Sequence, residues 1–300
     1  MNPISHLLTA YRKLHKLTQK ELVAEFSHYS KEFKALNTVT LSRWETGTTT
    51  PSLTKKKHLL HFLANTDCFK IDRNCHKVVH TAYERLYDPL GTLFTCKYQY
   101  LIGNMPEHRT GKHTIENLKT FSQSFEHIEH IIDIEIATNA RNYYAVTPTL
   151  FAQWCKHPSS FCIIAERKRQ HLGHFIMLKI KNHVAEEIAH HKRREFDLNA
   201  NDFCAAEENG TYYVHAMYGR SPKIAAELNV KAYLHLFNHI NTIDNLMIFS
   251  SRADGILLTQ DYGIKEIARG VDEKYKFKWH GMLSPIEEIL FSDTVIKLVF

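Results

Sequence analysis

The stretch LNTVTLSRWETGTTTPSL, residues 36–53, decides how the N-terminal part of this chain folds. It predicts the start of a helix, because Asn37 or Thr38 can accept a hydrogen bond from a backbone N–H of the first turn. Leu41 and Trp44 are three positions apart and therefore lie on one face of that helix, which we expect to be buried. The stretch thus indicates a short amphipathic helix with a capped N-terminus.

The end and the outer face of this helix also follow from the residues. Gly47 accepts a positive φ and is typical of the residue just after a helix, and Pro51 opens the next helix. Upstream, Thr18 followed by Glu21 predicts a capping box at the start of another helix. The side chains that point away from the buried face cluster in the N-terminal half of the short helix: Thr38, Val39, Thr40, Ser42 and Arg43.

The order Thr40-Leu41-Ser42-Arg43-Trp44-Glu45-x-Gly47, followed by Pro51, resembles the Cro/C1-type (XRE) family of helix-turn-helix regulators. The upstream Leu17-Thr18-Gln19-Lys20-Glu21-Leu22 is similar to the second helix of that family. The resemblance implies that residues 1–65 bind double-stranded DNA, with the short helix in the major groove. The DNA-binding residues that it implies are Gln19, Thr38, Val39, Thr40, Ser42, Arg43, Lys55 and Lys56.

These residues divide into two expected roles. Thr38, Val39, Ser42 and Arg43 would contact base edges, with Arg43 at guanine, whereas Gln19 and the lysines 55–57 would contact phosphates. The formal net charge of +6 permits this partner. Lysines outnumber acidic residues along residues 1–60, an excess that phosphate neutralisation would use.

The spacing between the two helices departs from the family pattern, since it is longer than the usual short turn. Residues 26–36 must therefore either lengthen the second helix or form a larger loop. We expect the aromatic side chains of this segment, Phe26, Tyr29 and Phe33, to cover the core. In the final helix of the domain we expect the apolar residues to face inward: Leu59, Leu60, Phe62 and Leu63.

The length of 300 residues and the 44% of hydrophobic residues are typical of a globular chain with about two domains. No apolar run is long enough to span a membrane, and the N-terminus lacks the apolar core of a secretory signal. The six cysteines form no CxxC pair, which predicts a reduced, cytoplasmic protein. His127 and His130 could share a helix face, but no ligand set accompanies them, so no metal site is predicted.

Residues 66–115 are too apolar for a flexible linker and predict a helical, apolar connector that packs against another domain or a second subunit. A helix is then expected over residues 114–139. Its core stripe would comprise the apolar residues at helical spacing: Leu118, Phe121, Phe125, Ile128, Ile131 and Ile132.

Residues 140–300 alternate between predicted strands and helices. SFCIIAER and HLGHFIMLKI are apolar runs joined by the polar residues 168–171, which is typical of a β-hairpin. TYYVHAMYG predicts another strand and leads into the helix PKIAAELNVKAYLHLFNHI. NLMIFSS follows as a strand, and ADGILLTQDYG as a helix that ends at Gly263.

This order resembles the GCN5-related N-acetyltransferase (GNAT) fold, and LFAQWCKHPSSFCIIAER followed by HLGHF is similar to the start of such domains. The resemblance implies a GNAT-like mixed-sheet α/β domain over residues 116–300. The fold class is therefore multidomain, α and α+β. An all-α helix-turn-helix domain would be followed by the connector and then by this domain.

In the GNAT family, an Arg/Gln-x-x-Gly-x-Gly/Ala loop after the fourth strand holds the pyrophosphate of acetyl-CoA on backbone N–H groups at a helix N-terminus. The matching residues are Arg220-Ser221-Pro222-Lys223-Ile224-Ala225. Arg220 and Ala225 fit the pattern, Lys223 replaces the first glycine and could hold phosphate as a point charge, and Pro222 removes one N–H donor. The resemblance thus implies a degenerate site for acetyl-CoA or another acyl-CoA at Arg220, Lys223 and Ala225.

The family's general acid is also altered. Its Tyr-x-x-x-Gly-Phe motif corresponds to Thr259 and Gly263-Ile264, and a threonine has no pKa suited to protonating a thiolate. Tyr262 is adjacent but is expected to point elsewhere. No catalytic residue is therefore assigned from the resemblance.

Together these features predict a cytoplasmic transcription regulator with no membrane partner. Its GNAT-like domain would sense a ligand or mediate dimerisation, since helix-turn-helix domains commonly bind half-sites as homodimers. The alternative is an N-acetyltransferase that uses acetyl-CoA and carries an attached DNA-binding domain. A third possibility is an adaptor that binds no nucleic acid.

Overall fold

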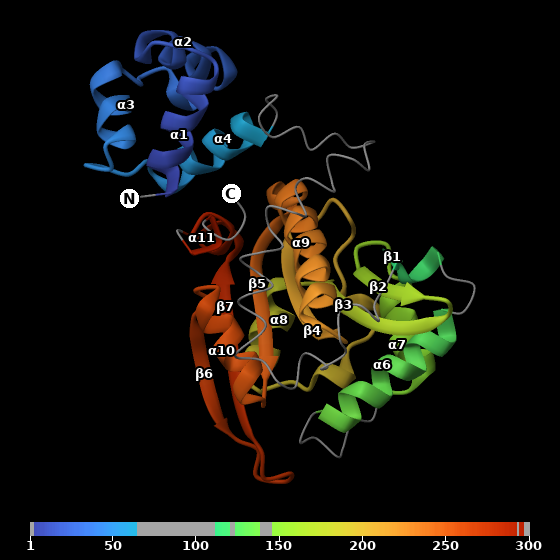
Figure 1. The fold of residues 1–300 in the computed structure, drawn as a ribbon. Helices are drawn as coiled ribbons and strands as arrows, with labels where there is room; N and C mark the ends of the chain where they lie inside the picture. Colours follow the sequence, from blue (N-terminus) through green and yellow to red (C-terminus); the bar gives the residue numbers. More distant parts are fainter. Residues whose placement is uncertain (1–2, 65–111, 121–123, 139–145, 293, 297–300) are drawn as a thin grey trace. The chain divides into compact units, whose positions relative to one another are not determined.

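A computed structural model describes residues 3–64, 112–120, 124–138, 146–292 and 294–296 of the chain (Figure 1). The chain divides into two compact units, residues 1–86 with 290–300 and residues 87–289. Nearly all of the predicted connector, residues 66–115, lies outside the described residues. None of the described helices is long and apolar enough to cross a membrane.

The described part of the first unit is helical, as predicted. Thr18 caps one helix through a capping box with Glu21, and Asn37 caps the predicted short helix by accepting from Thr40 N at 2.8 Å. Gly47 has a φ of 74°, as expected of a residue that ends a helix. The elements are α1 (Pro3–Leu14), α2 (Gln19–Tyr29), the 3₁₀ turn η1 (Lys31–Phe33), α3 (Thr38–Glu45) and α4 (Leu53–Ala64).

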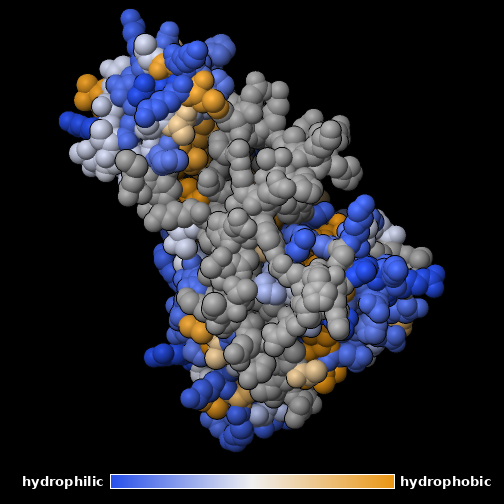
Figure 2. All heavy atoms as spheres, viewed as in Figure 1, coloured by the Kyte–Doolittle hydropathy of each residue, from blue (hydrophilic) through white to orange (hydrophobic). Residues whose placement is uncertain are grey.

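The long segment between α2 and α3 is divided between a helix end and a turn. Ser30 ends α2 and also caps η1, so the extra residues form a separate 3₁₀ turn between the two helices. Phe26 and Phe33 are fully buried and their rings lie 5.2 Å apart, as expected of core residues. Tyr29 differs from the expectation, because it is 41% exposed, although its ring makes an edge-on contact with Phe62. Figure 2 shows that the visible face of this unit is mostly hydrophilic.

The second unit is built on a mixed sheet whose strand order is β1-β2-β3-β4-β5-β7-β6. β4 and β5 are parallel and are joined through a helix, and every other neighbouring pair is antiparallel. The strands are β1 (Thr114–Asn117), β2 (Phe161–Arg167), β3 (Gln170–Ile180), β4 (Gly210–Gly219), β5 (Ile243–Ser250), β6 (Glu266–Val271) and β7 (Lys278–Pro285). The helices of more than one turn are α6 (Ser124–Thr138), α7 (Pro148–Lys156), α8 (Asn182–Ala189), α9 (Pro222–Asn238), α10 (Ala253–Asp261) and α11 (Ile286–Leu290).

The prediction of one helix over residues 114–139 is wrong in its first part. Residues 114–117 form β1, which pairs with β2 in the register Thr114↔Glu166. These four residues alternate between exposed and half-buried positions, a period-2 pattern that suits an edge strand rather than a helix. Ile128 and Ile131 are buried in α6 as expected, whereas Phe125 is 49% exposed and Phe121 lies outside the described residues.

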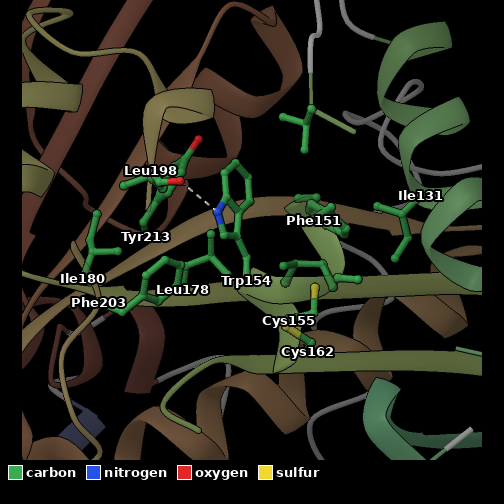
Figure 3. Packing of buried hydrophobic residues seen from close by; sticks show 14 of the residues in the cluster. Ile131, Phe151, Trp154, Cys155, Cys162, Leu178, Ile180, Leu198, Phe203 and Tyr213 are labelled. Atoms are coloured by element: carbon green, nitrogen blue, oxygen red, sulfur yellow. Dashed lines mark hydrogen bonds between the residues drawn. The ribbon is translucent and has the colours of Figure 1, made fainter. Parts of the chain in front are cut away.

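The main core of this unit lies between the sheet and the helices α6, α7 and α8. Figure 3 shows Trp154 of α7 at its centre, between Phe151 and Tyr213, with its indole N–H donating to the carbonyl oxygen of Leu198 at 3.2 Å. α9 packs against β2, β3 and β4, on the face of the sheet opposite α8 (Figure 1). Because helices cover both faces, β3 is buried from Leu172 to Ile180.

Candidate functional site

The outer face of α3 is the first candidate site. Leu41 and Trp44 are buried, so the opposite side of the helix faces solvent, where Val39 is 60% exposed and Arg43 is exposed. The other predicted base-contacting side chains, Thr38 and Ser42, are half-buried, as is that of Thr40. α3 therefore presents a short row of polar and small side chains next to an exposed guanidinium.

The residues predicted to contact phosphates differ in their contacts within the protein. Gln19 at the start of α2 donates its amide to Glu45 Oε2 at 2.7 Å, so one of its two amide protons is engaged within the protein. Lys55 lies 5.8 Å from the centre of the Trp44 ring, which places its ammonium beside α3. Lys55 and Lys56 are both half-buried at the start of α4.

The second candidate site lies in the sheet of the second unit, where β4 and β5 separate. The two strands pair only from Gly210 to Val214, whose partner is Ile248. Beyond that point β4 continues as residues 215–219, while β5 continues to Ser250 along β7. The separation starts at His215, the extra residue of a β-bulge, because β3 pairs Met177 with Val214 and Ile176 with Ala216.

The predicted acyl-CoA loop lies at the far end of β4. Arg220 N donates to Leu172 O at 2.7 Å, and Ser221 caps α9 by accepting from Ile224 N at 3.3 Å. Pro222 occupies the first turn of α9, so Lys223 supplies the first backbone N–H of the helix. Arg220 thus lies between β4 and α9, and Lys223 and Ala225 lie in the first turn of α9.

The chain approaches this helix closely because of Gly219. A Cβ atom at position 219 would lie 2.6 Å from the backbone nitrogen of Ala225, which is too short for a real contact. The end of β4 therefore packs directly on the first turn of α9. Gly219 was not among the residues assigned from the sequence, since it precedes the loop motif.

Two buried polar side chains lie beside the β4 bulge on the α7 face of the sheet. The ring of His215 makes a tilted contact with Phe151 and an edge-on contact with Trp154, at 5.3 and 5.7 Å between centres. Its Nδ1 lies 3.9 Å from Glu195 Oε2, and that carboxylate accepts the hydroxyl proton of Tyr213. A buried carboxylate beside a buried imidazole is suited to taking up a proton. Sequence reasoning missed this pair because Glu195 comes from a 3₁₀ turn remote from β4 in the chain.

Thr259, at the general-acid position of the family motif, is buried, and its hydroxyl donates to Ile256 O at 2.7 Å. Tyr262 points toward α9, where its hydroxyl donates to Asn229 Oδ1 at 3.2 Å. Burial raises the pKa of Tyr262, which makes it a poor proton donor at neutral pH. Tyr262 thus points away from the position of Thr259, as the sequence predicted.

The predicted histidine pair on α6 is brought near β3. The rings of His127 and His130 lie 5.4 and 6.2 Å from that of His171. Among the residues that the structure describes, no group of three histidine, cysteine or acidic side chains is placed to hold a metal ion. Cys155, Cys162 and Cys204 are buried free thiols.

A scan against protein-family models gives no match, and no curated protein matches the chain. Several solved structures have a similar fold. FeeM, an N-acyl amino acid synthase from uncultured soil microbes, is 14% identical, with a TM-score of 0.42 over 59% of this chain and 94% of its own. An N-acetyltransferase from Staphylococcus aureus is 9% identical, with a TM-score of 0.38 over 58% of this chain and 98% of its own. An aminoglycoside 6'-N-acetyltransferase complexed with coenzyme A is 7% identical, with a TM-score of 0.38 over 58% and 97%.

Proposed function

We propose that the second unit is an N-acyltransferase that takes an acyl group from an acyl-CoA thioester and transfers it to an amine. The observation that carries the proposal is the separation of β4 from β5 at the bulge residue His215, directly before the capped N-terminus of α9. This replaces ligand sensing as the main function of the domain and adopts the alternative that the sequence left open.

The separated part of β4 has one end near the start of α9, which could bind the pyrophosphate of an acyl-CoA, and the other end at His215, where the thioester could lie. The N-terminus of α9, with the side chains of Arg220 and Lys223, offers positive charge for the pyrophosphate. Gly219 allows the end of the strand to lie against Ala225, so the helix start is close to the sheet. At the other end, we infer that the thioester lies between the separated strands, next to His215.

The pair of Glu195 and His215 supplies the base for the reaction. An amine acceptor enters as an ammonium, which must lose one proton before its nitrogen can attack the thioester carbonyl carbon. The new N–C bond forms and the C–S bond breaks, so the products are an amide, a thiol and one released proton. His215 takes up this proton, and the buried carboxylate of Glu195 favours the resulting imidazolium.

The absence of a tyrosine to protonate the leaving group slows the reaction less for a thiolate than it would for an alkoxide. A free thiol has a pKa of about 8.5, so a thiolate can leave and take its proton from solvent. Thr259 therefore has no role in the transfer, and its hydroxyl keeps its hydrogen bond to the carbonyl oxygen of Ile256.

Isothermal titration calorimetry with acetyl-CoA and a long-chain acyl-CoA tests the proposal, followed by thiol release in the presence of primary amines. Arg220→Ala should weaken binding at least tenfold, and His215→Gln should abolish thiol release while leaving binding in place. Lys265→Ala, an exposed change, is the matched control. Absence of acyl-CoA binding by the full chain would reject this function.

DNA binding by the first unit is a second candidate, favoured by the exposed outer face of α3. The helix is held by its buried side, through Trp44 and Glu45, so its outer side chains are presented on a rigid support. The two functions are compatible, since they use separate units. An N-acyltransferase with an attached DNA-binding domain, acting as a homodimer on paired half-sites, would combine them.

Selection from a pool of random-sequence duplexes, followed by mobility-shift titration of the enriched sequences, tests this candidate. An enriched motif bound at least a hundredfold more tightly than the starting pool would support it. Equal binding of all duplexes, with no enrichment, would exclude sequence-specific recognition.

A further inference from the structure

A row of four ionisable side chains runs from β2 through α6 to the interior of the second unit. Glu166 Oε2 lies 2.9 Å from His127 Nε2, and His127 Nδ1 lies 3.2 Å from His171 Nδ1. His171 Nε2 in turn lies 3.0 Å from His174 Nδ1. Each imidazole thus uses one nitrogen toward the carboxylate and the other toward the interior.

A second β-bulge makes this row possible. Residues three apart in a regular strand point to opposite faces, so His171 and His174 would normally be separated by the sheet. β2 pairs Glu166 with His171 and Ala165 with Gly173, which leaves Leu172 as an extra residue in β3. The bulge restores His171 and His174 to the same face, where α6 supplies His127.

The hydrogen bonds allow two proton arrangements. An ionised Glu166 only accepts, so His127 must carry a proton on Nε2. If His127 is neutral, its Nδ1 accepts from His171 Nδ1–H, and His171 Nε2 accepts from His174 Nδ1–H. His174 Nε2 is then a bare lone pair. If His127 is protonated on both nitrogens, every bond reverses and His174 Nε2 carries the proton.

The two arrangements differ by one proton added at His174 Nε2 and one charge that appears on His127. His174 is fully buried, and its Nε2 has no hydrogen-bond partner among the described residues. Burial, with a further effect from His215, lowers the pKa of His174 to about 3, so a charge cannot stay there. Burial, followed by the nearby histidines and Arg220, also lowers the pKa of His171. On His127, by contrast, the charge would lie against the carboxylate of Glu166.

We propose that His174, His171, His127 and Glu166 form a proton path that carries the proton released by the amine acceptor from the β4 bulge toward the surface. The inference rests on the proposed acyl transfer and deepens it. His215, on the strand next to β3, is the group that hands over the proton. The groups that face the path are His215 and Tyr218 of β4, Arg220, and His130 of α6.

The transfer balances in protons. The proton that leaves the ammonium is taken up by His215 and passed to the lone pair of His174 Nε2. His174 releases its Nδ1 proton to His171 Nε2, and His171 releases its Nδ1 proton to His127 Nδ1. His127 is then an imidazolium paired with Glu166, and solvent takes its Nε2 proton at the carboxylate. The row is left with the reversed tautomers, so the three imidazole rings must turn over before the next proton enters. Every step is a proton transfer between two nitrogen atoms or to solvent, so no oxidant, reductant or further reactant is needed.

The tautomers of the full chain provide a test that needs no activity. With ¹⁵N-labelled histidine at pH 7.5, we expect the NMR shifts of His174 to show a proton on Nδ1 and a bare Nε2. His171→Phe keeps an aromatic ring but removes the acceptor of that proton, so His174 should become a mixture of tautomers. His130→Phe, next to the same ring but outside the row, is the matched control. A proton on His174 Nε2 in the wild-type chain would overturn the path.

The pH profile of thiol release gives the second readout. His171→Phe should slow the reaction at least tenfold at pH 6.5 and should approach the wild-type rate above pH 9, where more of the amine is already deprotonated. A purely structural role would lower the rate equally at all pH values, and that result would overturn the path. If the wild-type chain binds no acyl-CoA, the proposed function fails and the path fails with it. Binding and turnover combined with a protonated His174 Nε2 would overturn the path alone.

Discussion

Arg12 of α1 and Glu45 at the end of α3 form a partly buried ion pair, with Arg12 Nε 2.6 Å from Glu45 Oε1. A second bond joins Arg12 Nη2 to Glu45 Oε2 at 3.2 Å, and Gln19 donates to the same carboxylate. The hydrogen bond to Glu45 raises the pKa of Arg12. The carboxylate of Glu45 thus links the end of α1, the start of α2 and the end of α3, and these bonds fix the direction of α3.

Glu45→Gln should destabilise the first unit by about 1–3 kcal/mol, because it leaves the guanidinium of Arg12 beside a neutral amide. Urea unfolding followed by helical circular dichroism measures the change. Arg43→Ala, an exposed substitution on the same helix, should change the unfolding free energy by less than about 0.5 kcal/mol. Equal effects of the two substitutions would show that the ion pair does not support α3.

Arg43→Ala should weaken binding to an enriched duplex by about 1–3 kcal/mol and leave binding to random duplexes nearly unchanged, because a base contact is lost. Fluorescence anisotropy with both duplexes measures the two losses. His6→Gln, an exposed change on α1, serves as the control. Equal losses on both duplexes would place Arg43 among the phosphate contacts.

Lys55→Ala should weaken binding to both duplexes alike and reduce the slope of log K against log salt concentration by about one, because one phosphate contact is lost. Titrations at several salt concentrations measure the slope. An unchanged slope would show that Lys55 serves only to pack against Trp44.

Stability of the second unit should fall as the pH drops below about 6.5. Burial, with smaller effects from His239 and Lys179, lowers the pKa of His235 to about 3. The unfolded chain therefore binds more protons than the folded one between those values. The contribution of His235 is complete above pH 6.5 and declines toward pH 3, at about 1.4 kcal/mol per pH unit.

Urea unfolding at pH 7.5, 6 and 5 measures this dependence. His235→Gln, which removes a half-buried imidazole outside the proton path, should flatten the pH dependence relative to the wild type. An identical slope in the two proteins would mean that His235 is protonated in the folded state.

Gly219→Ala should reduce acyl-CoA affinity at least tenfold, because the new Cβ would meet the backbone of Ala225 and push the first turn of α9 from the sheet. Calorimetry measures the affinity, and unfolding measures a stability loss of about 1–3 kcal/mol. Lys223→Ala changes the same turn without placing a new atom against Ala225 and is the control for the packing effect. Full affinity in Gly219→Ala would contradict the placement of the cofactor at α9.

Several elements were predictable because their signals lie within a few residues of each other. The capping box of Thr18 and Glu21, the cap of Asn37 and the positive φ of Gly47 all occur where expected. The hairpin turn likewise has positive φ angles at Lys168 and Arg169, as a two-residue turn between β2 and β3 requires. β6 and β7 had no such signal and were not assigned from the sequence.

The candidate sites were less predictable. The loop 220–225 was proposed from its sequence pattern, but the pair of Glu195 and His215 and the row from Glu166 to His174 were not. Their members come from different strands, turns and helices, and two β-bulges decide which side chains share a face. A one-residue shift in strand register reverses the face of every side chain beyond it, and nothing near His171 or His215 in the sequence marks that shift.

The sequence by itself determined the helices of the first unit and most strands of the second, because caps, turns and hydrophobic periods act over a few neighbouring residues. Only the tertiary structure decided which polar groups meet inside the second unit. His127 and Glu166 are far apart in the chain and come together because α6 packs on the face of the sheet that the bulge in β3 selects. Contacts of that kind depend on the register and packing of whole elements.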